Sequence, residues 1–342
     1  MSLAATALPM AALADYLAQH VPNIRGPLTA TKFSGGQSNP TYLLASASGR
    51  WVLRRKPPGT LLSSAHAVDR EFRVLTALQD SAVPVARPIH LCTDDSVIGS
   101  MFYLMDYVDG RVFWDPALPS INAADRGAYY RSAITTLAAI HAVDVAAVGL
   151  TDYARPGNYF ARQIKRWSEQ YGATATAANA DAAMDRLLAW LPAHCPADDG
   201  QLALVHGDFR FDNLMFAQQQ PQVLAVVDWE LSTLGHPLAD LGYFCMALRL
   251  PQNPILSGLA GLDRHALGIP SEAALIDLYA AASGRNPQGD WHFHLAFNFF
   301  RLAAIAHGVY QRALAGNASS ERALEAGRMA RLVSQLGAEH CG

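Results

Sequence analysis

Two short segments near the middle of the chain constrain its fold more than any other part of the sequence. The first runs Leu204-Val-His-Gly-Asp-Phe-Arg-Phe-Asp-Asn-Leu-Met-Phe216, and the second runs Leu224-Ala-Val-Val-Asp-Trp-Glu230. Asp208 and Asn213 lie on one tight loop, and Asp228 ends an apolar run that predicts a buried strand. The sequence therefore predicts two acid-bearing loops, the second of which directly follows a buried strand.

These residue types suit the transfer of a phosphoryl group. The reaction needs oxygen ligands for Mg²⁺ and one carboxylate that orients the attacking hydroxyl and accepts its proton. Asn213 and Asp228 would supply the metal ligands and Asp208 the catalytic base, in the order that protein kinases use. His206 and Gly207 stand where a protein kinase carries His-Arg, so the arginine that pairs with a phosphorylated activation loop is missing. The pattern therefore favours a kinase that acts on small molecules.

The motif His-Gly-Asp, four residues, Asn and then a strand-borne Asp resembles the aminoglycoside phosphotransferase and choline kinase family. Two further phrases, Asp228-Trp-Glu-Leu-Ser-Thr-Leu-Gly-His-Pro-Leu-Ala-Asp-Leu241 and Val52-Leu-Arg-Arg-Lys-Pro-Pro-Gly59, resemble the branch fused to, or encoded beside, acyl-CoA dehydrogenases. The resemblance runs from about Thr31 to about Arg312. His236 stands where antibiotic kinases more commonly have the Asp of Gly-Asp-Pro, which weakens an aminoglycoside assignment.

The resemblance implies an α+β, protein-kinase-like fold of two lobes. The expected N-lobe, residues 1–106, has an N-terminal helix, a small antiparallel sheet and a phosphate-binding loop. The expected C-lobe, residues 107–342, is mostly helical and carries the catalytic loop, the metal loop and the acceptor site. A length of 342 residues exceeds one typical domain of about 100–200 residues, which agrees with two lobes. Apolar patterning predicts helices over residues 69–78, 123–143, 158–171, 181–191, 272–283 and 291–314.

A glycine-containing turn interrupts a β-type pattern that extends from Leu28 to about Arg55. The turn reads Ser34-Gly-Gly-Gln-Ser-Asn39, and its glycines would let backbone amides approach a phosphate closely. The residues expected to bind phosphate are Gly35, Gly36, Gln37 and Ser38. The turn alone is typical of any β-hairpin, and a kinase phosphate loop is itself a hairpin. The motif downstream favours the phosphate-binding interpretation.

A basic strand end follows this turn. Val52 and Arg54 share one face because side chains alternate along a strand. Arg54 takes the position of the lysine that pairs with phosphates in protein kinases, a departure that choline kinases share. We expect Glu71, on the next helix, to pair with Arg54, whereas Arg55 and Lys56 suit a solvated strand end.

Three further positions follow from the resemblance. Met101-Phe-Tyr-Leu-Met-Asp-Tyr-Val-Asp-Gly110 resembles the linker between lobes, where the backbone of Asp106, Tyr107 and Val108 would bind the adenine edge. Asp240 takes the place of an acid that braces the catalytic loop. Arg210 would either contact an anionic acceptor or brace the same loop, and we favour bracing.

Composition and charge exclude several classes of protein. The hydrophobic content of 51% and the charged content of 16% describe a compact globular chain. A net charge of −3 implies no basic face, so we expect no nucleic-acid partner. No apolar run reaches the roughly 18 residues of a membrane helix, and we expect no membrane partner. Four cysteines, far apart in the sequence, suggest a reducing compartment, and we expect a cytoplasmic protein.

The sequence thus predicts an ATP- and Mg²⁺-dependent phosphotransferase acting on a hydroxyl group. The resemblance to the acyl-CoA-dehydrogenase-associated branch implies a hydroxyacyl-CoA or hydroxy acid as acceptor, and a functional link to an acyl-CoA dehydrogenase. An antibiotic or choline-type kinase remains an alternative. Two further alternatives are a catalytically inactive, nucleotide-binding partner of a dehydrogenase and a nucleotidyl transferase on the same fold.

Overall fold

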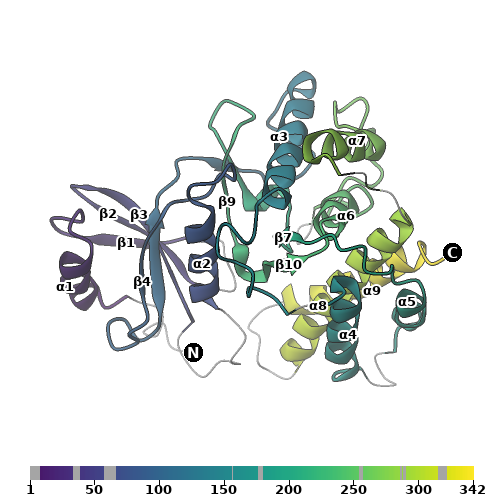
Figure 1. Ribbon diagram of the computed structural model, residues 1–342, viewed down its shortest axis with the longest axis horizontal. Helices are drawn as coiled ribbons and strands as arrows, with labels where there is room; N and C mark the ends of the chain where they lie inside the picture. The colour runs from purple at the N-terminus through teal and green to yellow at the C-terminus, as the bar shows by residue number, and fades with distance from the viewer. Residues whose placement is uncertain are drawn as a thin grey trace. The chain divides into compact units, whose positions relative to one another are not determined.

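The chain divides into two compact units (Figure 1). A computed structural model describes residues 8–33, 39–57, 67–155, 157–175, 180–253, 257–285, 287, 290–314 and 322–342. The first unit comprises Met1–Arg111, Val148–Leu150 and Asn213–Ser232. The second comprises Val112–Ala147, Thr151–Asp212 and Thr233–Gly342. The expected boundary between lobes after residue 106 stays a prediction. Within the first unit, Asn213–Ser232 groups with the sheet, and Val226 N–H donates a 2.8 Å hydrogen bond to the carbonyl of Pro84.

A five-stranded antiparallel sheet organises the first unit, with strand order β1-β2-β3-β5-β4. Its strands are β1 (Thr29–Lys32), β2 (Thr41–Ser46), β3 (Gly49–Arg55), β4 (Pro88–Cys92) and β5 (Phe102–Asp106). Helix α1 (Met10–His20) precedes the sheet, and helix α2 (Val68–Leu78) lies between β3 and β4 in the chain. The central strand β3 pairs Leu53 with Leu104 and Arg54 with Tyr103 of β5.

Both faces of β3 are covered, which corrects one expectation from the sequence. Leu13 and Leu17 of α1 share a hydrophobic core with Leu53, and α2 packs against the neighbouring strand β5. Arg55 is consequently buried rather than solvated, and its Nε donates a 3.0 Å hydrogen bond to the hydroxyl of Ser100. Period-2 alternation predicts which residues share a face, but it cannot show that both faces are covered.

A small second sheet completes the first unit. Strand β8 (Leu214–Phe216) pairs with β9 (Val223–Val226), and β6 (Arg111–Val112) lies on the other edge of β8. The 3₁₀ turn η4 (Trp229–Leu231) follows β9 and packs against α2. This hairpin brings the predicted metal-binding positions into the same unit as the five-stranded sheet.

Helices dominate the second unit. They are α3 (Ala123–His141), α4 (Tyr159–Gly172), α5 (Ala182–Ala193), α6 (Leu238–Met246), α7 (Glu272–Ser283), α8 (Trp291–Leu314) and α9 (Arg322–Ala338). Side-chain caps explain three of the starts, because Asn158, Asp181 and Ser271 each accept hydrogen bonds from backbone N–H groups of the first turn. Besides α2 of the first unit, the helices predicted from the sequence correspond to α3, α4, α5, α7 and α8, whereas α6 and α9 were not expected from it.

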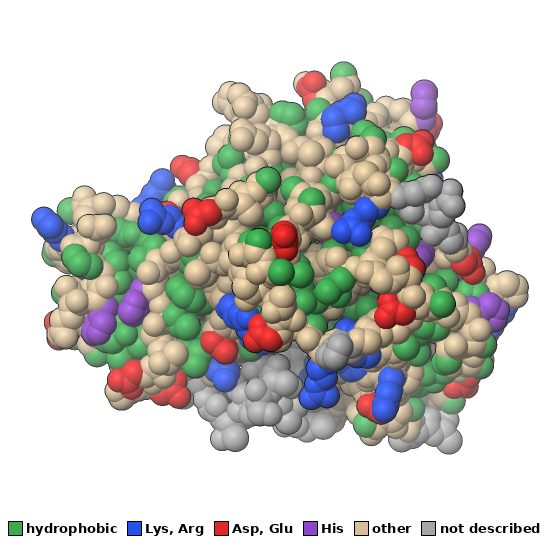
Figure 2. Space-filling model, in the orientation of Figure 1, with side chains coloured by type: hydrophobic (Ala, Val, Ile, Leu, Met, Phe, Trp, Pro, Cys, Tyr) green, Lys and Arg blue, Asp and Glu red, His purple; other side chains and the backbone are tan. Residues whose placement is uncertain are grey.

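The core of the second unit forms around α8. This helix packs against α4, α5, α6 and α9, and it contributes Phe293, Phe297 and Phe300, all fully buried. A two-stranded ladder of β7 (Ala203–Val205) and β10 (Thr233–Gly235) leads into the segment that carries Asp208. None of the helices in the described part of the chain is long and apolar enough to cross a bilayer. On the face shown in Figure 2, acidic and basic side chains are interspersed, in keeping with the small net charge.

Candidate active site

An ion pair between β3 and α2 lies at the centre of the first unit. Arg54 Nε is 2.8 Å from a carboxylate oxygen of Glu71, and both side chains are largely buried. Glu71 also accepts hydrogen bonds from the Asn39 amide at 2.8 Å and from the Tyr103 hydroxyl at 3.0 Å. These partners fix its carboxylate, because a buried charge is tolerated only when it is paired and hydrogen-bonded. The ion pair predicted from the sequence is present, and its role toward a nucleotide stays a prediction.

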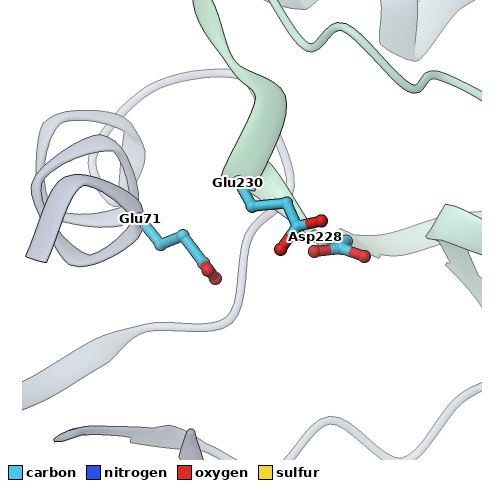
Figure 3. A group of neighbouring side chains, drawn as sticks. All are labelled: Glu71, Asp228 and Glu230. Carbon is cyan, nitrogen blue, oxygen red and sulfur yellow. The ribbon is translucent and has the colours of Figure 1, made fainter. Parts of the chain in front are cut away.

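The same arginine contacts two more acids. A terminal guanidinium nitrogen of Arg54 is 2.5 Å from Asp228 and 3.8 Å from Glu230. One carboxylate oxygen each from Glu71, Asp228 and Glu230 lies within 4.8 Å of the others. Figure 3 shows Glu71 extending from a helix toward the other two side chains, which come from the segment after β9. We call these three residues the acidic cluster.

The acidic cluster carries more negative charge than its arginine neutralises. Burial, opposed by Arg54 and reinforced by Asp228 and Glu230, raises the pKa of Glu71 to about 7. Asp228 also has φ +65° and ψ +61°, a left-handed conformation that is uncommon for residues other than glycine and concentrates at functional sites. A group of oxygen ligands with excess negative charge is the environment that Mg²⁺ prefers in proteins.

Asn213 and Asp228 come from neighbouring strand ends. In the β8–β9 ladder Leu214 lies opposite Val226, and Val227 N–H donates a 3.0 Å hydrogen bond to the carbonyl of Asn213. Asn213 precedes β8 and Asp228 follows β9, so both leave the ladder at the same end. The two residues predicted as metal ligands are therefore close in the backbone of the first unit.

In the second unit, Asp240 holds the loop that carries Asp208. Its carboxylate accepts hydrogen bonds from the N–H groups of His206 at 2.6 Å and Gly207 at 2.8 Å. Gly207 has φ +84°, which glycine adopts without the steric cost that a side chain would add. Although burial alone would raise the pKa of Asp240, the hydrogen bond from His141 and these N–H groups hold it below its ordinary value. The expected bracing acid is thus a charged acceptor beneath the loop.

Asp208, the predicted base, is partly buried on this loop. Burial raises its pKa, while the positive charge of Arg210 and a hydrogen bond from the Tyr243 hydroxyl oppose the rise. The guanidinium of Arg210 pairs in a bidentate manner with the carboxylate of Asp212 on the same loop. Arg210 therefore stabilises the loop, which is the role that we favoured.

The remaining predicted positions are less well defined. Gly35, Gly36, Gln37 and Ser38 lie outside the described residues. Asp106 is the last residue of β5, and its N–H donates to the carbonyl of Arg87 at 2.9 Å. The ring of Tyr107 is covered by the guanidinium of Arg50, with Cζ 4.3 Å from the ring centroid, and Val108 accepts from Gly110 N–H at 3.1 Å. Adenine recognition by Asp106, Tyr107 and Val108 stays a prediction.

Glu230 is the residue of the acidic cluster to which we assigned no role from the sequence. It lies two positions after Asp228, and in an extended strand the two side chains would share one face. The chain instead makes a 3₁₀ turn at Trp229–Leu231. The indole of Trp229 packs in the core, and its N–H donates a 3.0 Å hydrogen bond to the carbonyl of Val226. The acid-Trp-acid sequence was the available signal.

These features define a class of protein. An antiparallel sheet whose third strand pairs a basic residue with a glutamate on the following helix is characteristic of protein kinases, as is a braced aspartate loop followed by Asn and Asp. The chain has a kinase-like phosphotransferase fold. It belongs to the phosphotransferase enzyme family, whose model matches residues 29–292.

Solved structures and curated relatives agree with this family. A protein of Ralstonia eutropha JMP134, provisionally assigned as an aminoglycoside phosphotransferase, is 47% identical, with a TM-score of 0.88 over 98% of both chains. The spectinomycin phosphotransferase APH(9)-Ia, at 13% identity and a TM-score of 0.63 over 96% of this chain and 98% of that one, shares the fold.

Two curated relatives are named for a different enzyme. Acyl-CoA dehydrogenase family member 10 of Mus musculus is 45% identical over 96% of this chain and 31% of its own length. Acyl-CoA dehydrogenase family member 11 of Homo sapiens is 41% identical over 90% of this chain and 40% of its own length. The chain thus spans 31% of the length of the first relative and 40% of the length of the second.

Proposed function

We propose that the protein transfers the γ-phosphoryl group of ATP to a hydroxyl group of a small molecule, with Mg²⁺ as cofactor. The observation that carries the proposal is the contact of Arg54 with both Glu71 and Asp228. It joins the expected phosphate-binding residue, its positioning acid and the expected metal ligand in one buried group. Family membership supports the same reaction class.

Each residue of the first unit would have one task. Arg54, held by Glu71, would bind the α- and β-phosphates with its planar fork of N–H donors. The loop with Gly35, Gly36, Gln37 and Ser38 would cover the phosphates, and the backbone of residues 106–108 would bind the adenine edge. Because the Arg54 fork also contacts Asp228 at 2.5 Å, nucleotide binding would redistribute its hydrogen bonds.

The acidic cluster and Asn213 fit a magnesium ion. The donors are carboxylate and amide oxygens, the ligands of a hard cation, and the carboxylates of the cluster lie within 4.8 Å of one another. Asn213 and Asp228 would be the ligands. Bound Mg²⁺ supplies neutralisation of the charge that develops on the phosphate oxygens.

Asp208 would orient the acceptor hydroxyl and take its proton. Its loop is fixed by the two N–H groups that Asp240 binds, so the carboxylate position is set before the substrate arrives. Asp208→Asn should lower turnover about 10²- to 10⁴-fold, the usual contribution of a general base. ATP binding should be largely kept, because the substitution leaves Arg54 and the acidic cluster unchanged.

For the acceptor we propose a hydroxyacyl-CoA or a hydroxy acid. The support is the identity to relatives named for acyl-CoA dehydrogenases, with which we also propose a functional link. Aminoglycoside-type and choline-type acceptors are the competing candidates, since an aminoglycoside phosphotransferase assignment accompanies the similar Ralstonia structure.

The test is release of ADP from Mg-ATP in the presence of hydroxyacyl-CoAs, hydroxy acids, choline and aminoglycosides, with Asp208→Asn as control. Acceptor-dependent ADP that disappears in the variant supports the proposal and identifies the acceptor class. Pyrophosphate in place of ADP would indicate a nucleotidyl transferase. Tight ATP binding without turnover on any acceptor would favour a nucleotide-binding partner of a dehydrogenase, the second candidate that the longer relatives suggest.

A further inference from the structure

A buried arginine of the second unit lacks an acidic partner. Arg301, on α8, is only 5% exposed to solvent. In the part of the chain that the structure describes, no carboxylate lies within ion-pair distance of its guanidinium. Arginine keeps its charge inside proteins, and a buried charge without a counter-ion is unfavourable. Such a residue points to an anionic ligand.

Two aromatic rings hold this guanidinium in place. Arg301 Cζ lies 5.6 Å from the ring centroid of Tyr243 and 5.9 Å from that of Trp167. The rings come from α6 and α4, and α8 packs against both helices (Figure 1). Aromatic faces attract a guanidinium but carry no net charge. They therefore fix the position of Arg301 without neutralising it.

A second arginine lies on the same ring. Arg166, an exposed residue of α4, has Cζ 4.9 Å from the ring centroid of Trp167. Partial desolvation of its guanidinium and the positive charge of Arg301 lower the pKa of Arg166, so the two cations act on each other. Both also act electrostatically on Tyr159, a buried residue of α4. Two cations held together in this way favour an oxyanion that both can contact. We call Arg166 and Arg301 the arginine pair.

The buried member of the arginine pair, Arg301, is linked to the predicted catalytic base by one tyrosine. The Tyr243 hydroxyl donates a hydrogen bond to the Asp208 carboxylate, and the ring of the same residue faces Arg301. One tyrosine thus separates the base from the buried cation. Since Asp208 would orient the acceptor hydroxyl, an anion at the arginine pair would belong to the acceptor rather than to ATP.

We propose that the arginine pair binds a carboxylate or phosphate of the acceptor, and thereby selects hydroxylated anions over neutral alcohols and polycationic aminoglycosides. This inference rests on the proposed function, because it identifies the acceptor by its distance from Asp208. Arg301 is the buried anchor, and Arg166 completes the site at the surface. A cationic acceptor would be repelled by the positive charge of the arginine pair. This repulsion would add to the selectivity for anionic acceptors.

A purely structural role for Arg301 makes different predictions. The aliphatic stem of an arginine can pack against aromatic rings and stabilise a core without binding anything. Arg301→Met keeps most of that packing and removes the charge, whereas Arg301→Lys keeps the charge and loses the planar fork. Lys165→Met is a matched control. The substitution removes one positive charge from α4, the helix that also carries Arg166, and the Lys165 side chain is 77% exposed.

The first experiment measures ADP release with 3-hydroxybutyrate and 6-hydroxyhexanoate, their methyl esters, their CoA thioesters and their pantetheine thioesters. Arg301→Met should raise KM for anionic acceptors about tenfold or more, the usual effect of losing a charge-assisted hydrogen bond. KM for ATP should be unchanged, and Arg301→Lys should recover part of the loss. Lys165→Met should behave as the wild type.

The acceptor series separates the two sources of the anion. Preference for the free acid over its methyl ester assigns a carboxylate to the arginine pair. Preference for the CoA thioester over the pantetheine thioester, which lacks the phosphates, assigns a phosphate. Equal turnover of charged and uncharged acceptors by the wild type would overturn the inference.

The second experiment measures binding of the same acids and CoA thioesters by calorimetry, without ATP. Binding that is lost in folded Arg301→Met, together with no turnover, would leave the anion site standing and reject the proposed function. Turnover of anionic acceptors that Arg301→Met leaves unchanged would retain the proposed function and reject the anion site. Neither binding nor turnover with any acceptor would reject both.

Discussion

The acidic cluster of the first unit and the arginine pair of the second unit have opposite charge imbalances. In the cluster, Arg54 is shared by Glu71, Asp228 and Glu230. Arg301, by contrast, has two aromatic neighbours and no carboxylate at ion-pair distance among the described residues. Each imbalance indicates the ligand that would relieve it: a cation in the first region and an anion in the second.

The comparison also shows that burial of an arginine has no single meaning. Arg54 and Arg301 are both buried, yet Arg54 satisfies neighbouring acids whereas Arg301 does not. Removing the first would leave unpaired acids behind, and removing the second would not.

Among the variants that test the contrast between Arg54 and Arg301, Asp228→Ala should cause the largest loss of activity. It removes a predicted metal ligand from the acidic cluster, so we expect turnover to fall about 10²- to 10³-fold or more, the range seen when one electrostatic contact to the transition state is removed. Initial rates of ADP release at several Mg²⁺ concentrations measure the effect. If Asp228→Ala kept full activity at the Mg²⁺ concentration that suffices for the wild type, the acidic cluster would not be the metal site.

Arg54→Met should destabilise the protein by about 3–5 kcal/mol, because it leaves Glu71 buried without its counter-ion. Urea unfolding followed by circular dichroism measures the change. Glu71→Gln in the same background should restore part of the stability by removing the unpaired charge. A loss below about 1 kcal/mol would mean that water or other groups compensate the charge of the acids, and that Arg54 is not needed to neutralise Glu71.

Tyr243→Phe should move the acid side of the activity profile to higher pH. Burial raises the pKa of Asp208 above its ordinary value, so the base becomes protonated and turnover is lost as pH falls through that raised pKa. The Tyr243 hydrogen bond favours the charged carboxylate and opposes the rise. Its removal therefore raises the pKa further. A profile of kcat against pH that is identical to that of the wild type would contradict this coupling.

Arg301→Met should change the free energy of unfolding by no more than about 1 kcal/mol, since no acid is left unpaired. The same urea titration measures it beside Arg54→Met, which makes the two arginines each other's control. A loss as large as that of Arg54→Met would show that Arg301 has a structural partner and would weaken the case for an anion site.

Much of the first region could be predicted from the sequence. The spacing of Asp208, Asn213 and Asp228 is local, and one strand-borne arginine followed by a helix with Glu71 is a short-range pattern. Glu230 was missed although the acid-Trp-acid sequence was a signal for it, because only the 3₁₀ turn after Asp228 brings its carboxylate toward the others. Arg55 was placed wrongly in solvent, because alternation along β3 cannot reveal that α1 and α2 cover both faces.

The sequence by itself determined the family, the order of the predicted catalytic and metal-binding residues and five helices of the second unit, since each depends on residues near one another in the chain. Only the tertiary structure decided where charge remains uncompensated. Arg166, Tyr243 and Arg301 come from α4, α6 and α8, and no local pattern relates them. Helix packing brings them together, because the core residues of α8 fix which of its side chains faces α4 and α6.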